Sequence, residues 1–277
     1  MQGISLEKPA KRRNGFFTRN SRLLRLVLHL LLGVAKIVLL FPFAGQVRRA
    51  ELVRAWSVRV LAILDVDLVV KGHVPDASAR GVLFVSNHIS WLDIYLLQAV
   101  RPVRFVSKAE VRSWPLIGWL AEKTGTIFVE RTRRHDTART NKAVIDALNQ
   151  GDCVALFPEG TTSNGTLLRP FHSSLLQPAV ATEALLWPVT IRYVQPDGAA
   201  NLAPAYVDDI SFADSLQRVL SEPGLVAEIT YLEPLRAQGR SRRELVALAE
   251  SAISSALNLA APGRKPGKPA GPPGARP

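Results

Sequence analysis

Apolar and polar residues in the middle of the chain, residues 65–260, alternate with two different periods. Short apolar runs rich in Val, Ile and Phe are typical of buried strands, and apolar residues at helical spacing are typical of helices. The predicted strands are VDLVVKG, GVLFVSN, VRFVS, TIFVER, CVALF, WPVTIRY and LVAEITYL. One predicted helix starts at Trp91. The other predicted helices cover residues 108–112, 114–123, 137–149, 174–182 and 242–257. This order predicts an α/β fold with a mainly parallel sheet flanked by helices on both faces.

A strongly apolar stretch precedes this region, at residues 23–44. Its cleanest part, residues 26–41, would form a helix of roughly 24 Å, which is shorter than the roughly 30 Å hydrocarbon core of a bilayer. Pro42 and Gly45 should end this helix, and a second helix with interleaved apolar and Arg residues should follow over residues 46–64. Basic amphipathic helices of this kind lie among the headgroups of anionic membranes. We therefore predict an N-terminal two-helix membrane-anchoring motif that dips into one leaflet. The alternative is a helical hairpin packed on the domain.

The formal charge of +12 on the 277 residues is concentrated at the two ends of the chain. Residues 1–59 contain 12 Lys and Arg and two acids, the tail from Ala261 adds four basic residues, and residues 60–260 carry a net charge of −2. A folded region without excess positive charge argues against a nucleic-acid-binding protein. The single cysteine, Cys153, excludes an intramolecular disulfide and a cysteine-rich metal site.

These patterns divide the chain into four parts. Residues 1–22 form a basic N-terminal arm, and residues 23–64 form the two-helix anchor. Residues 65–260 form the α/β domain. The tail, residues 261–277, is rich in Pro, Gly, Lys and Arg and has almost no apolar residues, so we expect it to be disordered.

Three loops that follow predicted strands carry the candidate chemistry, because ligands of parallel α/β sheets bind beyond the carboxyl ends of strands. The first loop, residues 87–93, holds His88 and Asp93. With His88 in the loop and Asp93 in the first turn of the next helix, the carboxylate can fix the imidazole tautomer and leave the other ring nitrogen as a base. The alternative is a purely structural capping pattern, with Ser90 as the N-cap and Asp93 as the third helical residue.

The second and third loops supply residues suited to an anionic or polyol ligand. GTIFVER ends in Arg131, whose guanidinium suits a phosphate or a carboxylate, although a surface ion pair explains it equally well. FPEGTTSNG begins a 14-residue irregular connection, residues 158–171, and connections of this length are usually functional. In it Glu159 could accept hydrogen bonds from a polyol, and Gly160 lets the backbone approach a ligand.

The order and spacing of four short blocks are more specific than any one of them. NHISWLD, GTIFVER, FPEGTTS and WPVTIRY resemble the four sequence blocks of the glycerol-phosphate and lysophosphatidic acid acyltransferase family, most closely its bacterial 1-acylglycerol-3-phosphate acyltransferases. The stretches SKAEVRSWPLIGWL and FHSSLL are also similar to that family. The resemblance covers roughly residues 66–195, and the N-terminal two-helix motif matches the family as well.

The resemblance implies transfer of a fatty acyl group from a thioester, on coenzyme A or acyl carrier protein, to the free hydroxyl of 1-acyl-sn-glycerol-3-phosphate, giving phosphatidic acid. His88 would take the hydroxyl proton, and Asp93 would orient the imidazole. The residues implied around the glycerol-phosphate group are Lys108, Arg131, Glu159, Gly160 and Thr161. No cofactor is expected besides the thioester co-substrate, and no metal site. The expected location is the cytoplasmic face of the inner membrane, with monotopic or single-pass attachment to the lipid surface.

Three alternatives stay open at this point. Lyso-ornithine lipid acyltransferases share the same blocks, so their acceptor is the runner-up within the family. A membrane-bound serine hydrolase would use Ser163, but Thr161 stands where the nucleophile-elbow motif G-x-S-x-G needs its first glycine. A non-enzymatic membrane adaptor would need all three loops to be inert.

Overall fold

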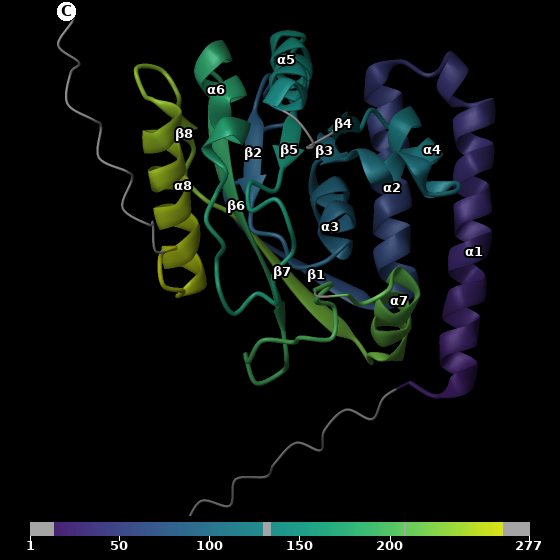
Figure 1. The fold of residues 1–277 in the computed structure, drawn as a ribbon. Helices are drawn as coiled ribbons and strands as arrows, with labels where there is room; N and C mark the ends of the chain where they lie inside the picture. Colours follow the sequence, from purple (N-terminus) through teal and green to yellow (C-terminus); the bar gives the residue numbers. More distant parts are fainter. Residues whose placement is uncertain (1–13, 130–133, 208, 263–277) are drawn as a thin grey trace, which may run out of the picture.

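The computed structural model describes residues 14–129, 134–207 and 209–262. These residues build one sheet with the strand order β1-β7-β6-β2-β5-β3-β4, and β8 pairs with β6 beyond the end of β7 (Figure 1). Strands β6, β2, β5, β3 and β4 are mutually parallel, whereas β7 runs antiparallel to β6 and β1 runs parallel to β7. The strands are β1 Val66–Gly72, β2 Leu83–Ser86, β3 Arg104–Lys108, β4 Ile127–Val129, β5 Val154–Leu156, β6 Leu185–Val194, β7 Leu225–Tyr231 and β8 Leu235–Arg236. The predicted mainly parallel α/β fold is therefore confirmed.

Helices cover both faces of this sheet (Figure 1). On one face lie α5, α6 and α8, and on the other lie α2, α3 and α7, with α1 outermost. The helices are α1 Phe16–Leu39, α2 Gln46–Leu64, α3 Leu92–Val100, α4 Ile117–Lys123, α5 Arg134–Asn149, α6 Gln177–Thr182, α7 Phe212–Ser221 and α8 Arg242–Leu257. Three short 3₁₀ helices are η1 Phe41–Phe43, η2 Ala109–Ser113 and η3 Ser173–Leu176.

The central strand β2 shows why the sheet needs helices on both sides. All four of its residues are buried, and successive side chains of a strand point to opposite faces. Phe84 packs into the core beside α2, α3 and α7, whereas Leu83 and Val85 pack into the core beside α5, α6 and α8. A continuous apolar run such as GVLFV is typical of a strand buried on both faces.

The N-terminal helices α1 and α2 form a hairpin on the α3 side of the domain (Figure 1). The break between them falls at η1, and Gly45 is the N-cap of α2, as predicted from Pro42 and Gly45. His29 of α1 and Trp56 of α2 hold the hairpin together. Their rings stack at 5.2 Å, His29 Nε2 lies 3.0 Å from the Trp56 carbonyl oxygen, and Trp56 Nε1 donates to the His29 carbonyl oxygen at 3.3 Å. Among the described residues, none of the helices combines the length and apolar character needed to cross a membrane.

Two elements of the structure have no counterpart in the sequence prediction. Helix α7 begins after Ser211, whose hydroxyl accepts a hydrogen bond from the Asp214 backbone N–H. This is the Ser-x-x-Asp start pattern of a helix, so the signal was present in the sequence. Strand β8 has only two residues, Leu235 and Arg236, which is too short for any periodic pattern. Helix α1 also begins at Phe16, inside the segment assigned to the basic arm.

Candidate active site

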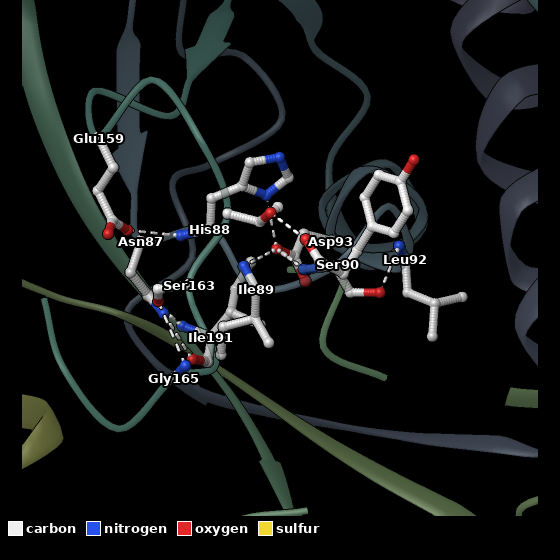
Figure 2. Close-up of polar contacts among 12 residues, drawn as sticks. Asn87, His88, Ile89, Ser90, Leu92, Asp93, Glu159, Ser163, Gly165 and Ile191 are labelled. Carbon is white, nitrogen blue, oxygen red and sulfur yellow. Dashed lines mark hydrogen bonds and ion pairs between the residues drawn. The ribbon is translucent and has the colours of Figure 1, made fainter. Parts of the chain in front are cut away.

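The candidate site lies where the carboxyl ends of β2 and β5 meet in the middle of the sheet. His88 follows β2 by two residues, and Glu159 follows β5 by three. Because β2 and β5 are parallel neighbours, their following loops leave the same edge of the sheet. Figure 2 shows the two loops side by side, with the His88 ring above Asp93 and the Glu159 carboxylate beside the His88 backbone.

His88 and Asp93 form the predicted pair. His88 Nδ1 lies 2.8 Å from Asp93 Oδ2, and the exposed fraction of the side chain is 19% for His88 and 0% for Asp93. A carboxylate accepts hydrogen bonds, so Nδ1 carries the proton and Nε2 is left with its lone pair. The imidazole also stacks on the Phe157 ring, with centroids 3.8 Å apart and planes at 7°. The ring is therefore fixed on one face and at one nitrogen, while the side chain keeps contact with solvent.

The Asp93 carboxylate is surrounded by donors because it sits at the start of α3. Oδ2 accepts from the backbone N–H groups of Ile89 at 2.7 Å and Ser90 at 3.0 Å, and Oδ1 accepts from the Tyr193 hydroxyl at 2.7 Å. A fully buried carboxylate requires such donors to remain charged. The same residue thus orients the imidazole and closes the loop that precedes the helix.

The capping pattern predicted for this helix differs in its register. Helix α3 begins at Leu92 with Trp91 as its N-cap, so Asp93 is the second helical residue and not the third. The Ser90 hydroxyl accepts from the Leu92 N–H at 3.3 Å, and the Asp93 N–H donates to the Ser90 carbonyl oxygen at 3.1 Å. The Asp93 carboxylate contacts the imidazole and the backbone of the preceding loop, but it does not cap α3, whose N-cap, Trp91, has no side-chain hydrogen bond.

Glu159 is buried, with 3% of its surface exposed, and connects three parts of the site. Its Oε1 accepts from the His88 backbone N–H at 2.8 Å, and its Oε2 accepts from the Arg169 backbone N–H at 3.0 Å. Burial raises the pKa of Glu159 to about 7, opposed by these two hydrogen bonds and by the positive charge of Arg169. Each carboxylate oxygen thus accepts one backbone N–H, and the predicted contact of Glu159 with a polyol acceptor stays a prediction.

Three of the other residues predicted around the acceptor, Lys108, Gly160 and Thr161, lie within the described part of the chain. Gly160 has a φ of +75°, and its N–H donates to the Phe157 carbonyl oxygen at 3.1 Å. Thr161 is exposed, and Lys108 is exposed at the carboxyl end of β3. Arg131 lies outside the described residues, so its role stays a prediction. Lys108, Gly160 and Thr161 are thus placed on loops or strand ends at the same edge of the sheet as His88.

Ser163 lacks the surroundings of a hydrolase nucleophile. Its side chain is buried, and its hydroxyl donates to the Leu167 carbonyl oxygen at 3.3 Å while accepting from the Gly165 N–H at 3.2 Å. Its backbone N–H donates to the His88 carbonyl oxygen at 2.8 Å. Ser163 therefore shapes the loop around His88.

Two further residues of the site were missed from the sequence. Asn87 bonds the β6 backbone at Ile191 through both ends of its amide, with its Nδ2 donating at 2.9 Å and its Oδ1 accepting at 2.8 Å. Tyr193 reaches Asp93 from the same strand, two residues further along β6. Asn87 stands next to His88 in the first block, and Tyr193 ends the fourth block, WPVTIRY. Their position inside the blocks was the signal available.

Comparison with known proteins agrees with this geometry. The acyltransferase family model matches residues 67–192, which include both loops of the site. A lyso-ornithine lipid O-acyltransferase from Pseudomonas aeruginosa is 40% identical over 243 residues, covering 86% of this chain and 92% of that protein. The chain belongs to the acyltransferase family. The resemblance inferred from the four blocks is confirmed, and the protein is an acyltransferase.

Two other similar proteins bear the name of the predicted activity. A 1-acyl-sn-glycerol-3-phosphate acyltransferase from Neisseria gonorrhoeae is 35% identical, over 78% of this chain and 84% of that protein. The crystal structure of the 1-acyl-sn-glycerophosphate (LPA) acyltransferase PlsC from Thermotoga maritima matches with a TM-score of 0.66 at 21% identity, covering 87% of this chain and 94% of that one. At that identity, the likeness to the solved acyltransferase shows the fold alone.

Proposed function

We propose that this acyltransferase moves a fatty acyl group from a thioester, on coenzyme A or acyl carrier protein, to the free hydroxyl of 1-acyl-sn-glycerol-3-phosphate. The single observation that carries the proposal is the His88–Asp93 pair at the carboxyl end of β2. His88 Nδ1 lies 2.8 Å from Asp93 Oδ2, which leaves Nε2 of the imidazole as a base. The product would be phosphatidic acid, and the reaction would belong to phospholipid synthesis.

The geometry suits direct transfer without an acyl-enzyme. His88 Nε2 takes the proton of the acceptor hydroxyl as its oxygen attacks the thioester carbonyl carbon. The C–S bond then breaks, the ester forms, and the departing thiolate takes the proton back from the imidazolium. Asp93 stabilises the imidazolium through Nδ1 during both steps. A thioester is already activated, so the protein needs a base more than a nucleophile.

An apolar cavity of about 160 Å³ between the α1–α2 hairpin and the domain suits the alkyl chain of a substrate. Residues of α1, α2, α3, β3 and α4 line it, among them Gly33, Trp56, Tyr95 and Ala121. Phe105, also on its wall, stacks on Phe157 at 6.0 Å, and Phe157 stacks on His88 at 3.8 Å. A chain in this cavity would leave its polar end toward the imidazole.

The surface of the α1–α2 hairpin supports attachment to a membrane. Its exposed apolar side chains are Phe16, Phe17, Leu24, Val27, Leu28, Leu31, Leu32, Val38, Leu39, Leu40, Phe43, Val47 and Val58. Exposed basic side chains, among them Arg25, Lys36 and Arg59, lie on the same two helices. Apolar side chains embed in the interface while basic ones meet anionic headgroups. We therefore propose monotopic attachment at the cytoplasmic face of the inner membrane, where a lysolipid meets a soluble thioester.

A lyso-ornithine lipid is the second candidate acceptor. It is favoured by the 40% identity to the Pseudomonas aeruginosa protein of that name, against 35% for the Neisseria gonorrhoeae protein. Either acceptor offers a free hydroxyl and an anionic group, and the Lys108 ammonium suits a phosphate or a carboxylate. A panel of lysophosphatidate and lyso-ornithine lipid, each with acyl-CoA and acyl carrier protein thioesters, distinguishes them by thiol release and product mass.

The test of the mechanism is His88→Ala in the full chain. The variant should lose acyl transfer, by a factor on the order of 1,000 or more, because the base is removed. It should still fold and bind vesicles, because the ring is partly exposed and belongs to the loop between β2 and α3, not to the α1–α2 hairpin. Near-normal turnover by purified His88→Ala with every acceptor of the panel would refute the mechanism.

A further inference from the structure

Tyr193 comes to the site from a strand far away in the sequence. It lies on β6, 100 residues after Asp93, and is 3% exposed. Its hydroxyl donates to Asp93 Oδ1 at 2.7 Å. Strand β6 is fixed here because the Asn87 amide bonds both the N–H and the carbonyl oxygen of Ile191. The strand that carries the phenol is thus tied to the residue next to His88.

We propose that Tyr193 is a positioning residue for acyl transfer: its hydroxyl locks the carboxylate of Asp93 in the orientation that holds the His88 ring. The proposal rests on the proposed role of His88 as the base. Tyr193 is buried and contacts Asp93, so it acts through the carboxylate and not on a substrate.

The distribution of donors around Asp93 gives the physical reason. The His88 ring, the Ile89 N–H and the Ser90 N–H all converge on Oδ2. Within the described part of the chain, Tyr193 is the donor to Oδ1. Since the Asp93 side chain has no exposed surface, loss of the phenol hydroxyl would leave Oδ1 without a partner. The carboxylate could then turn about its Cβ–Cγ bond and weaken its bond to the ring.

The phenol is itself held in a fixed orientation. The Ser90 side chain hydrogen-bonds the Tyr193 hydroxyl, and the Ser90 hydroxyl in turn accepts from the Leu92 N–H at the start of α3. Burial, together with the negative charge of Asp93, raises the pKa of Tyr193 well above its ordinary value. Tyr193 therefore keeps its proton at every pH at which the enzyme would be assayed, and it remains a donor to Asp93.

The test compares Tyr193→Phe with a matched control, Tyr231→Phe, in the full chain. Tyr231 is 2% exposed and lies on the neighbouring strand β7, where its ring packs edge-on against Phe84. Tyr193→Phe should lower kcat about 10- to 150-fold, the range expected for a lost hydrogen bond to a charged group, with the KM values little changed. Its pH–rate profile should rise at lower pH than that of the wild type, because a loosened carboxylate stabilises the imidazolium less. Tyr231→Phe should keep the wild-type kcat and profile.

A double-mutant cycle separates positioning from general stability. In an Asp93→Asn background, Tyr193→Phe should lower kcat less than two-fold further, because the group it positions is gone. An equal loss in both backgrounds, or a loss without the pH shift, would overturn the positioning role in favour of a structural one.

The two proposals fail separately. An inactive His88→Ala with a fully active Tyr193→Phe would overturn the role of Tyr193 and leave the proposed function standing. An active His88→Ala would overturn the proposed function itself. Circular dichroism and vesicle binding of each variant establish that the chain is folded before rates are compared.

Discussion

Glu159 and His88 are joined by a hydrogen bond of 2.8 Å from the His88 backbone N–H to the Glu159 carboxylate. Asp93 holds the ring of the same histidine at 2.8 Å. His88 is thus held by two acidic side chains, one from the first turn of α3 and one from the loop after β5. The Glu159 bond matters for the ring because the backbone at His88 sets the direction from which the imidazole leaves the loop.

Glu159→Gln should change how thermal stability depends on pH. Burial raises the pKa of Glu159 from 4.5 to about 7, so the folded protein holds this proton more tightly than the unfolded chain. The resulting stabilisation, of order 3 kcal/mol, is complete below the unfolded pKa and is lost as pH rises through the folded pKa. The Tm of the wild type minus that of Glu159→Gln should therefore fall between about pH 4.5 and about pH 7.

A glutamine at position 159 can accept from only one of the two backbone N–H groups, because its NH2 faces the other. We therefore also expect kcat to fall, roughly ten-fold, through a displaced His88 loop. Glu183→Gln is the matched control, since Glu183 is exposed at the end of α6. A Tm difference that stays constant with pH would show that Glu159 does not titrate in this range.

Asp93→Asn should lower kcat on the order of 100-fold or more, because a neutral amide stabilises the imidazolium poorly and can select the wrong tautomer. Some loss of Tm should accompany it, since the carboxylate also accepts from two backbone N–H groups. Asp214→Asn is the matched control, because Asp214 fills a similar first-turn position in α7 but is exposed and bonded to Ser211. If both variants lost only Tm, Asp93 would be a capping residue without a role in transfer.

The local part of the site could be predicted from the sequence, and the long-range part could not. His88 and Asp93 stand five residues apart at a strand-to-helix junction, so chain geometry alone lets them meet. The Tyr193 contact depends on β6 lying next to β2, a pairing that no local pattern encodes. The direction of the Glu159 carboxylate could not be predicted from the sequence either, because the side chain of a loop residue can point outward or into the domain.

The same distinction holds for the fold. Most strands were predicted because buried strands read as apolar runs, and the helix over residues 242–257 was predicted at its observed bounds. Helix α4 begins at Ile117, three residues later than predicted, because Pro115 and a positive φ at Leu116 form a turn before it. Helix α7 was missed although its Ser211 start pattern was present.

Lys108→Ala should raise the KM for the lysolipid while leaving kcat within about two-fold, because an exposed cation at the strand end contributes binding and not proton transfer. The expected rise in KM is about three- to ten-fold at low salt, and it should shrink as salt screens the charge. Lys71→Ala, on the edge strand β1 where Lys71 pairs with Glu228 at 2.7 Å, is the control for a lost surface charge. An unchanged KM would remove Lys108 from the acceptor site.

Phe43→Glu should weaken vesicle binding. The Phe43 ring is 90% exposed in the turn between α1 and α2, and embedding such a ring in a lipid interface stabilises binding by about 1.5–3 kcal/mol. Flotation with vesicles containing anionic phospholipid should show at least about a ten-fold loss of affinity. Leu248→Glu, 38% exposed on α8 at the opposite side of the molecule from α1 (Figure 1), should bind as the wild type does. Equal losses in both variants would indicate a non-specific charge effect and contradict the proposed attachment face.

Enlarging Ala121 should shorten the acyl chains that the enzyme accepts. Ala121 lines the apolar cavity from α4, opposite the α1–α2 hairpin, so each added carbon at this position removes space for the chain. In the series Ala121→Ser, Ala121→Val, Ala121→Phe, the preferred chain should become progressively shorter. Each methylene excluded from the cavity should cost the long-chain substrate about four-fold in kcat/KM, the equivalent of about 0.8 kcal/mol. Ala121→Ser, close in volume to alanine, should keep the wild-type preference. A uniform loss of rate for every chain length would show that the cavity holds no substrate chain. A loss of rate confined to long chains would place the alkyl group beside Phe105, whose ring stacks on Phe157, which in turn stacks on His88.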